Sequence, residues 1–384
     1  MRQNRKMDVD AKTALLGGMS PARFMQKHWQ KKPLLVRQAW PGVAPPLSRA
    51  ALFALAAKGD VESRLVLHDG PHWHVRSGPL PRRALPPTAR PGWTLLVQGL
   101  DLHVEAAHQM LQRFRFAPDA RLDDLMVSWA SDGGGVGAHV DAYDVFLLQV
   151  QGQRRWRVGR VTNPLFIADA PLKQLRRFKP TEDWLLSAGD MLYLPPGWGH
   201  EGTAVGGDCM TCSVGFSAPA AGALARELLA RVADEEDDSR QAMALYRDAQ
   251  QPATATPAAV PAALQDFARA ALQRLWADAD AVPRVLGAWL TEPKPRVWFD
   301  PPADAGNNTA GAVRLDPRTR MLYDARHVFI NGEALRAAGR DARTMRQLAD
   351  LRALSAADRK RLSPAAAAVL AGWLAAGWVR SAAP

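Results

Sequence analysis

The chain has 384 residues, of which 47% are hydrophobic and 23% charged, and it carries a formal net charge of +11. This composition excludes wholesale disorder, and the length allows about two or three domains with at least one large core. A positive charge attracts acidic partners such as nucleic acid. The basic residues stand in short pieces such as Lys31-Lys32 and Arg154-Arg155, which favours charges scattered over solvated faces and leaves nucleic-acid contact open.

The first segment, to about Ala120, is expected to mix helices with strands. Residues 1–10 are polar, and no apolar segment with a cleavage site follows them, so we predict no secretory signal and a cytoplasmic protein. Ser20 is a good N-cap and a proline suits the first helical position, which predicts a helix over Pro21–Trp29. Apolar segments at Ser63–His68 and Trp93–Gln98 predict strands.

From Leu122 to about Ala218, short apolar segments separated by glycine or proline predict an antiparallel β-barrel or sandwich. Gly152 predicts a tight hairpin between two of its strands. We expect the chemistry to lie in this region. The predicted strands are Leu122–Ala130, Val145–Val150, Arg154–Val158, Trp184–Leu186, Met191–Leu194 and Cys209–Phe216.

The two cysteines, Cys209 and Cys212, have the C-x-x-C spacing of zinc and redox sites. Because they fall in a predicted strand, residues i and i+3 would point to opposite faces. There is also no second cysteine pair to complete a tetrahedral zinc site. We therefore predict two structural thiols.

Beyond Pro219 the pattern becomes helical. Apolar residues at helical spacing predict one helical stretch over Gly222–Gln250 and another over Ala262–Leu290, separated by a proline-rich break. The apolar stretch Ala365–Val379 is shorter than the about 20 residues that span a bilayer, so we predict a buried C-terminal helix. A preceding basic helix and strand-like pieces make the last region similar to a winged helix, and those pieces are Val297–Phe299, Val313–Leu315 and His327–Ile330.

His139, Asp141 and His200 form the candidate metal site. In a strand, residues i and i+2 share a face and lie about 6–7 Å apart, so His139 and Asp141 can reach one ion. A second histidine from a facing strand would complete a two-histidine, one-carboxylate triad that leaves coordination positions open. Such triads hold Fe(II), manganese, nickel or zinc, and His-x-Asp pairs are also common by chance.

Arg154 is the candidate anion-binding residue. Strand alternation puts Arg154, Trp156 and Val158 on one face, which should be the buried face because it carries the tryptophan and the valine. A buried arginine needs an acid partner. That partner is either the remote carboxylate of a bound dicarboxylate or an internal Asp or Glu.

Several motifs together resemble those of the bacterial ribosomal oxygenases, JmjC-type enzymes that hydroxylate an arginine of large-subunit ribosomal protein sixteen. The motifs are Leu122–Ser128, Gly133–Phe146, Arg154–Gly159, Tyr193–Gly202 and Ser213–Phe216, with His28–Val36 near the N-terminus. The resemblance implies an α+β chain in three parts. A double-stranded β-helix (cupin/JmjC) catalytic domain would cover residues 1–218, a helical dimerisation region 219–291 and a winged-helix-like domain 292–384.

The resemblance also implies roles for single residues. Fe(II) would be held by the catalytic residues His139, Asp141 and His200, with 2-oxoglutarate and O2 as co-substrates. The residues that bind 2-oxoglutarate would be Arg154, Ser128 and Thr211, although Thr211 stands where relatives are expected to carry an amide. The substrate arginine, oxidised at Cβ, would be held by Asp124, Met126, Tyr143 and Ser213.

Two other functions remain open. One is a JmjC-type hydroxylase or demethylase that acts on another protein residue. Asp124 with Tyr143 favours arginine over that alternative, because a carboxylate and an aromatic ring both suit a guanidinium. The other is a non-enzymatic cupin and winged-helix protein that binds nucleic acid, which predicts steeply salt-dependent binding and indifference to His139→Ala.

Overall fold

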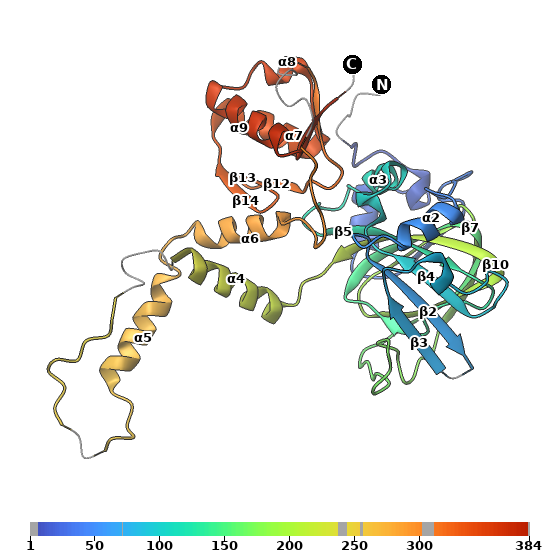
Figure 1. The fold of residues 1–384 in the computed structure, drawn as a ribbon, viewed down its shortest axis with the longest axis horizontal. Helices are drawn as coiled ribbons and strands as arrows, with labels where there is room; N and C mark the ends of the chain where they lie inside the picture. Colours follow the sequence, from blue (N-terminus) through green and yellow to red (C-terminus); the bar gives the residue numbers. More distant parts are fainter. Residues whose placement is uncertain (1–6, 71, 237–243, 254–255, 302–310, 383–384) are drawn as a thin grey trace. The chain divides into compact units, whose positions relative to one another are not determined.

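The computed structural model describes residues 7–70, 72–236, 244–253, 256–301 and 311–382 (Figure 1). Contacts divide the chain into two compact units. The first comprises Met1–Ala218, Lys294–Asp300 and Asp316–Arg318, and the second comprises Pro219–Pro293, Pro301–Leu315 and Thr319–Pro384. None of the helices in the described ranges is long and apolar enough to cross a membrane. The three-domain division of the sequence stays a prediction.

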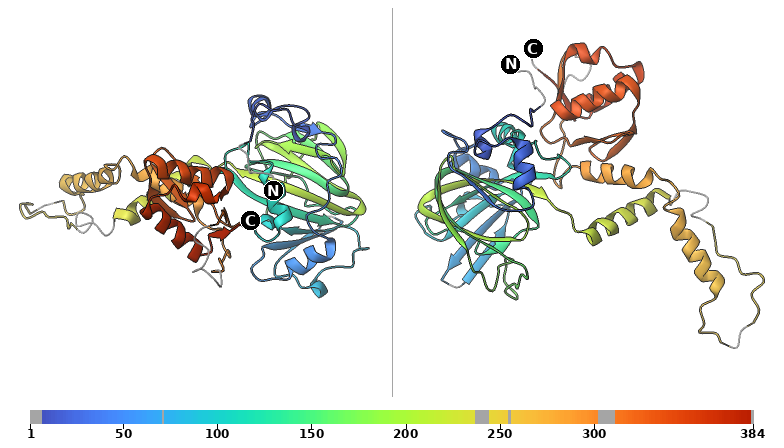
Figure 2. Two further views of the ribbon diagram at one scale, coloured as in Figure 1. Left: turned by 90° about the horizontal axis from the view of Figure 1, so that it is seen from above. Right: turned by 180° about the vertical axis from the view of Figure 1, so that it is seen from behind.

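The first unit is built on one ten-stranded sheet in the order β1-β9-β7-β10-β5-β4-β2-β3, with β6 beside β10 and β8 beside β7 (Figures 1 and 2). Its strand pairs are antiparallel, which confirms the predicted β architecture. The strands are β1 (Leu34–Val36), β2 (Ser63–Asp69), β3 (His72–Ser77), β4 (Trp93–Val97), β5 (Leu122–Ala130), β6 (His139–Val140), β7 (Tyr143–Arg160), β8 (Glu182–Ser187), β9 (Met191–Leu194) and β10 (Trp198–Ser217).

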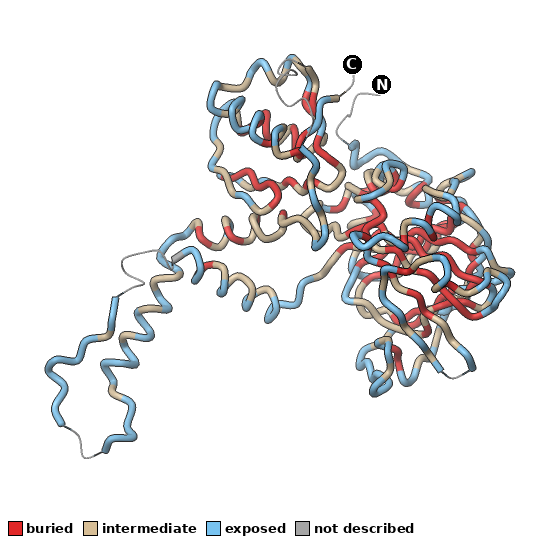
Figure 3. The backbone as a smooth tube through the Cα atoms, in the orientation of Figure 1, coloured by how far each residue is buried: buried red, intermediate tan, exposed pale blue. Residues whose placement is uncertain are grey.

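The long strand β7 faces two apolar cores, because successive side chains point to opposite faces of a sheet. Phe146 and Leu148 belong to the larger core, which also contains Phe24 of the N-terminal helix. Val145 and Leu147 belong to a smaller core that includes Trp156 and Val158. Figure 3 shows this concentration of buried chain in the first unit. The candidate site residues lie on the side of the smaller core.

The predicted hairpin at Gly152 is wrong, because β7 runs unbroken from Tyr143 to Arg160. Gly152 has a φ of +66°, which glycine adopts without strain, and a Cβ there would lie 3.0 Å from the Asp208 carbonyl oxygen. The partner strand β10 shifts register between Val205 and Met210. The glycine therefore marks a bulged stretch of one long ladder, and the two predicted strands are halves of β7.

Helices α1 (Pro21–Lys27), α2 (Arg49–Ala56) and α3 (Glu105–Gln112), with the 3-10 turns η1 (Ala14–Leu16), η2 (Arg82–Ala84) and η3 (Leu100–Leu102), complete the first unit. The Ser20 hydroxyl accepts from the Arg23 amide at 3.3 Å, so the predicted N-cap is confirmed. The first helix ends at Lys27, two residues before the predicted end. Its Phe24 packs edge-on against Tyr193 of β9, with ring centroids 4.9 Å apart, and so fixes the helix to the sheet.

The second unit begins with α4 (Ala221–Glu236), α5 (Ala262–Arg274) and α6 (Ala281–Thr291). Residues 244–250 are not helical, so the helix predicted to Gln250 is too long, and residues 237–243 lie outside the described part. The stretch predicted over Ala262–Leu290 divides into two helices. The Asp278 carboxylate accepts from the Asp280 amide at 2.8 Å, a local bond that competes with helical hydrogen bonding at the division.

The remaining elements form two three-stranded sheets, β15-β11-β16 and β12-β13-β14, with three helices. They are β11 (Val313–Leu315), β12 (Met321–Tyr323), β13 (His327–Ile330), β14 (Glu333–Arg336), α7 (Gly339–Leu351), β15 (Ala353–Leu354), α8 (Ala356–Arg359), α9 (Pro364–Ala375) and β16 (Val379–Ser381).

Two expectations for this region are wrong. Val297–Phe299 is not a strand, because the Val297 amide bonds the Lys294 carbonyl at 3.1 Å in a turn. Within α9 the buried residues are Leu370 and Trp373, and most of its alanines are exposed. Alanine buries little apolar area, so one stripe of larger side chains is enough to hold the helix.

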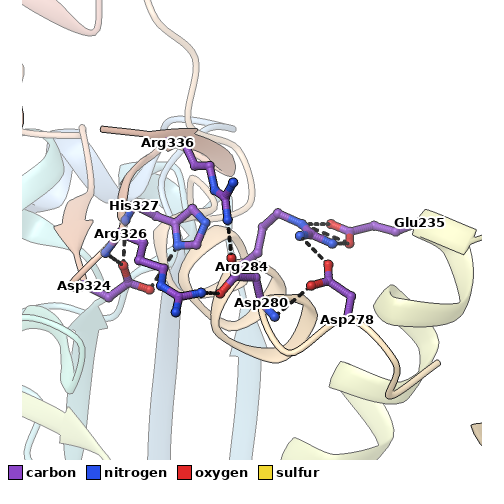
Figure 4. A network of polar contacts seen from close by, with 8 residues as sticks. All are labelled: Glu235, Asp278, Asp280, Arg284, Asp324, Arg326, His327 and Arg336. Atoms are coloured by element: carbon purple, nitrogen blue, oxygen red, sulfur yellow. Dashed lines mark hydrogen bonds and ion pairs between the residues drawn. The ribbon is translucent and has the colours of Figure 1, made fainter. Parts of the chain in front are cut away.

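A network of ion pairs joins α4, α6 and the β13–β14 hairpin (Figure 4). Asp280, just before α6, accepts from Arg326 and Arg336 at 2.5 Å each. Arg284 bonds Glu235 of α4 at 2.7 Å and Asp278 at 2.9 Å. A cavity of about 370 Å³ borders these groups. Since its charged lining side chains pair with one another, we assign the network to structure.

Candidate active site

The predicted triad comes together in the first unit. His139 of β6 pairs directly with His200 of β10, and their ring centroids lie 4.2 Å apart. The Asp141 Oδ2 atom lies 3.8 Å from His139 Nε2 and 3.6 Å from His200 Nε2. One ligand atom from each residue lies within 4.8 Å of the others, so all three can reach one ion.

The hydrogen bonds of His139 and His200 engage Nδ1 of each ring and leave Nε2 available to bind a metal. His139 Nδ1 lies 3.0 Å from the Gly137 carbonyl oxygen, and His200 Nδ1 lies 3.1 Å from the Trp198 carbonyl oxygen. A carbonyl accepts only from N–H, so each Nε2 keeps its lone pair. Burial, assisted by His139, lowers the pKa of His200 to about 4. Two imidazole nitrogens with one carboxylate fit Fe(II).

Arg154 is buried, as the strand alternation predicted. Only 4% of the residue is exposed, as is 5% of Trp156, whereas the side chains of Arg155 and Arg157 are 55% and 47% exposed. The Arg154 Nε and Nη2 atoms are buried without a hydrogen-bond partner among the described residues. The internal salt bridge considered as one alternative is not formed there. A buried guanidinium with unsatisfied donors fits an anionic ligand such as the distal carboxylate of 2-oxoglutarate.

One face of the β7–β10 ladder connects this arginine with the triad. His200 pairs with Val158, Gly202 with Trp156, and Ala204 with Arg154. The Trp156 ring centroid lies 5.8 Å from that of His200 and 5.8 Å from the Arg154 guanidinium carbon. The Cα atoms at the two ends are about 13 Å apart along the strand, and the long arginine side chain shortens that span. The face can therefore present a metal to one end of a dicarboxylate and a cation to the other.

Ser128 and Thr211 lie on the neighbouring β5–β10 ladder, where they pair directly, and both are buried. The Thr211 hydroxyl donates to the Gln149 Oε1 atom at 2.8 Å. The sequence argument missed Gln149, although it has the same strand parity as Leu147 on the inner face of β7. An amide thus stands beside the threonine that departs from the expected family pattern.

The predicted substrate residues Asp124 and Tyr143 converge on Gly215 of β10. A Cβ built on this glycine would lie 3.5 Å from Tyr143 Cδ1 and 3.9 Å from Asp124 Oδ1. Met126 and Ser213 pair directly on the adjoining rung. An acid and an aromatic ring therefore both lie within van der Waals reach of a Cβ at Gly215.

Sequence reasoning missed two charged residues at this position. Asp123 lies beside the same glycine, with its Cβ 3.9 Å from the built Cβ. The Lys294 ammonium donates to Asp123 Oδ1 at 2.7 Å and lies 4.0 Å from Asp124 Oδ2. The Asp-Asp pair in the sequence was a visible signal, but strand alternation assigned its two members to opposite faces.

Burial determines the electrostatics of this cluster. It raises the pKa of Asp124 to about 7, against the lowering effect of Lys294. Burial, followed by the charge of Asp123, also raises the pKa of Tyr143 to about 12, so the phenol stays protonated. For Lys294, burial alone would lower the pKa, but Asp124 and Asp123 raise it above its ordinary value. The lysine therefore stays charged.

The two cysteines are free and buried, which confirms that they are structural thiols. Cys209 belongs to a small cluster with Ala130 and Ala204, whereas Cys212 belongs to the large core. Burial raises the pKa of Cys212 above its ordinary value.

Comparison with known proteins agrees with the site. Residues 109–224 match the JmjC domain family, and residues 273–380 match the ROXA-like winged helix family. The chain is 34% identical over 329 residues to the Escherichia coli ribosomal protein uL16 3-hydroxylase, covering 83% of this chain and 86% of the relative. It is 35% identical over 206 residues to a probable ribosomal oxygenase of Haemophilus influenzae, covering 52% of this chain and 50% of that one.

The whole fold is also similar to a solved structure. The ribosomal oxygenase YcfD from Escherichia coli, in complex with cobalt and 2-oxoglutarate, superposes with a TM-score of 0.78 at 31% sequence identity. The superposition covers 94% of this chain and 97% of YcfD. This supports the expected combination of a double-stranded β-helix with a winged helix. The chain therefore belongs to the ribosomal oxygenase family and is a JmjC-type 2-oxoglutarate oxygenase.

Proposed function

We propose that this enzyme hydroxylates an arginine side chain, at Cβ, of large-subunit ribosomal protein uL16. The observation that carries the proposal is the meeting of Asp124 and Tyr143 at Gly215, where a built Cβ would lie 3.9 Å from the buried carboxylate and 3.5 Å from the tyrosine ring. A guanidinium pairs with a carboxylate through two N–H groups and stacks on an aromatic ring. The name of the Escherichia coli relative supports the ribosomal substrate.

Each predicted site residue has a proposed role in binding metal, co-substrate or substrate. His139, Asp141 and His200 would hold Fe(II), and Arg154 would bind the distal carboxylate of 2-oxoglutarate, with Ser128 and Thr211 near it. Fe(II) with 2-oxoglutarate and O2 supplies the oxidising chemistry when bound. Asp124 and Tyr143 would orient the guanidinium, with Met126 and Ser213 lining the rest of the pocket. The chain thus contributes binding, orientation and the exclusion of water.

The principal test is turnover by the full chain with Fe(II), 2-oxoglutarate and recombinant uL16. We expect succinate release that depends on uL16 and a gain of one oxygen atom on one arginine, located by mass spectrometry of peptides. His200→Ala should abolish both. Oxygen found on a histidine or lysine instead would replace this substrate assignment with the alternative JmjC activity.

The same protein also tests the alternative function, in which the chain binds nucleic acid through its winged helix and catalyses no reaction. If nucleic-acid binding were the function, His139→Ala would leave it intact and affinity would fall steeply with salt. Loss of uL16 hydroxylation in His139→Ala, with no salt-dependent nucleic-acid affinity in the unaltered chain, would support the enzyme. We infer that the enzyme acts in the cytoplasm, where its ribosomal substrate is made.

We also infer that the helical region forms a homodimer. Large apolar side chains are exposed here, since Leu229 of α4 is 40% exposed, Leu272 of α5 60% and Trp276, in the turn after α5, 51%. Burying such side chains favours association. Light scattering should give twice the chain mass, and Leu272→Glu should shift it toward the monomer. A monomeric unaltered chain would contradict this inference.

A further inference from the structure

Lys294 belongs to the first unit although it follows the helices of the second. It lies shortly after α6 in the chain, in the segment Lys294–Asp300, whose contacts group it with the first unit. Its side chain is 23% exposed, so most of it is removed from water. A lysine in such a place needs a compensating anion, and it has two nearby in Asp123 and Asp124.

A bulge brings those two carboxylates together. In the β5–β10 ladder, Val214 pairs with Leu125 and Phe216 pairs with Leu122. Two residues of β5, Asp123 and Asp124, therefore lie opposite the single residue Gly215. In a regular strand their side chains would point to opposite faces, but the bulge puts both next to this glycine.

The carboxylates of Asp123 and Asp124 accept hydrogen bonds from different donors. Asp123 Oδ1 accepts from the Lys294 ammonium at 2.7 Å. Asp124 Oδ2 accepts from the Gly99 amide at 2.7 Å, so this oxygen is already bonded to backbone. The other oxygen, Asp124 Oδ1, is the one that lies beside Gly215 near the Tyr143 ring. With Lys294 counted and Asp124 ionised, the pair carries one net negative charge, which matches a single guanidinium.

We propose that Lys294 is a positioning residue for the substrate cation: its ammonium compensates Asp123 and leaves the charge of Asp124 to the substrate guanidinium. This inference rests on the proposed arginine pocket and names a residue that the pocket needs. Without Lys294, the adjacent carboxylates share a proton and Asp124 loses charge. Without Asp123, the ammonium moves to Asp124, 4.0 Å away, and competes with substrate.

The titration of Asp124 supports this arrangement. The groups that act on Asp124 are Lys294, Asp123 and Asp101, with the Gly99 amide as a hydrogen-bond donor. Lys294 lowers the pKa of Asp124, whereas burial and the two neighbouring acids raise it. Loss of Lys294 should therefore move the pKa of Asp124 upward. A rise of about one unit from a pKa of about 7 reduces the ionised fraction at pH 7 roughly fivefold.

The test is a double-mutant cycle in the full chain, with Fe(II), 2-oxoglutarate and recombinant uL16. We expect Lys294→Met and Asp123→Asn each to raise KM for uL16 about fivefold at pH 7, with KM for 2-oxoglutarate unchanged. The double variant Asp123→Asn with Lys294→Met should return KM to within about twofold of the unaltered value, because Asp124 is again the single free charge. The exposed Lys58→Met serves as the matched control and should have no effect.

A second readout separates this inference from the proposed function. Carbon-13 NMR of the Asp124 carboxyl needs no turnover, and its pKa should rise in Lys294→Met but not in Lys58→Met. If unaltered chain fails to oxidise uL16, the proposed function fails while the titration still decides the role of Lys294. An unchanged titration, a lowered KM in Lys294→Met, or additive losses in the double variant would each overturn the inference.

Discussion

The guanidinium carbon of Arg154 lies 5.8 Å from the ring centroid of Trp156, and both residues are buried on one face of β7. The same face carries Val158, which pairs with His200 across the ladder. Among the residues that the structure describes, no acid pairs with this buried cation, which lies at a fixed place relative to the metal ligands. Burial of this guanidinium destabilises the ligand-free protein, but the same guanidinium can bind one carboxylate of a dicarboxylate ligand.

Replacing this arginine should separate stability from binding. Arg154→Met removes a buried charge that no described residue compensates, so the ligand-free protein should become more stable, by about 1–3 kcal/mol. The variant should lose the rise in Tm that 2-oxoglutarate with Mn(II) gives the unaltered protein. Differential scanning calorimetry measures both. Arg155→Met, an exposed neighbour, should keep the ligand-dependent rise, and a less stable Arg154→Met protein would indicate an unseen acid partner.

Gly202 should be intolerant of any side chain. A Cβ there would lie 2.6 Å from the Trp156 ring, which fills the face between His200 and Arg154. Gly202→Ala should displace the tryptophan at a cost of about 1–3 kcal/mol and raise KM for 2-oxoglutarate at least about tenfold. Steady-state succinate assays give that constant. Gly222→Ala is the control, because no atom lies within 4 Å of its built Cβ. Unchanged kinetics in Gly202→Ala would show that Trp156 does not shape the pocket.

Asp144 should matter for stability. Its carboxylate is fully buried and accepts from the Tyr193 hydroxyl at 2.6 Å, from Arg121 at 2.9 Å and from Gln30 Nε2 at 3.2 Å. Asp144→Ala leaves these three donors without this acceptor, so unfolding in urea should require about 3–5 kcal/mol less. The exposed pair Arg155–Asp183 offers a comparison, and Asp183→Ala should cost at most about 1 kcal/mol. Equal losses for the two variants would contradict the importance of burial.

The stability of the protein should depend on pH through Asp124. Its pKa is raised by burial to about 7, so the folded state favours the protonated carboxyl. The stabilising contribution is complete below the unfolded pKa near 4 and is lost as pH rises through about 7. Asn imitates the protonated form, so Asp124→Asn should gain stability over the unaltered protein as pH rises from 5.5 to 8.5, in buffers about one half unit apart. A gain that is constant across this range would show that Asp124 is ionised throughout.

The site was predictable where strand parity holds. His139, Asp141 and His200 were expected to meet because i and i+2 share a face, and the structure brings them within reach of one ion. The same alternation predicted the burial of Arg154. Alternation failed at Asp123, where the bulge opposite Gly215 places neighbouring residues on one side. The hairpin predicted from the glycine at 152 was wrong for another reason, because a glycine with positive φ is compatible with a bulged strand as well as with a hairpin.

The sequence by itself determined the metal ligands, the arginine on their face of the sheet and the family, because these depend on residue types at short, regular spacing. Their roles in binding metal, co-substrate and substrate remain predictions that the variants above test. Only the tertiary structure decided that Arg154 has no internal acid partner among the described residues and that Lys294 meets Asp123 across 171 residues of chain. The physical reason is that a local pattern fixes which way a side chain points. The neighbours it then finds depend on bulges and on distant segments, which no local spacing encodes.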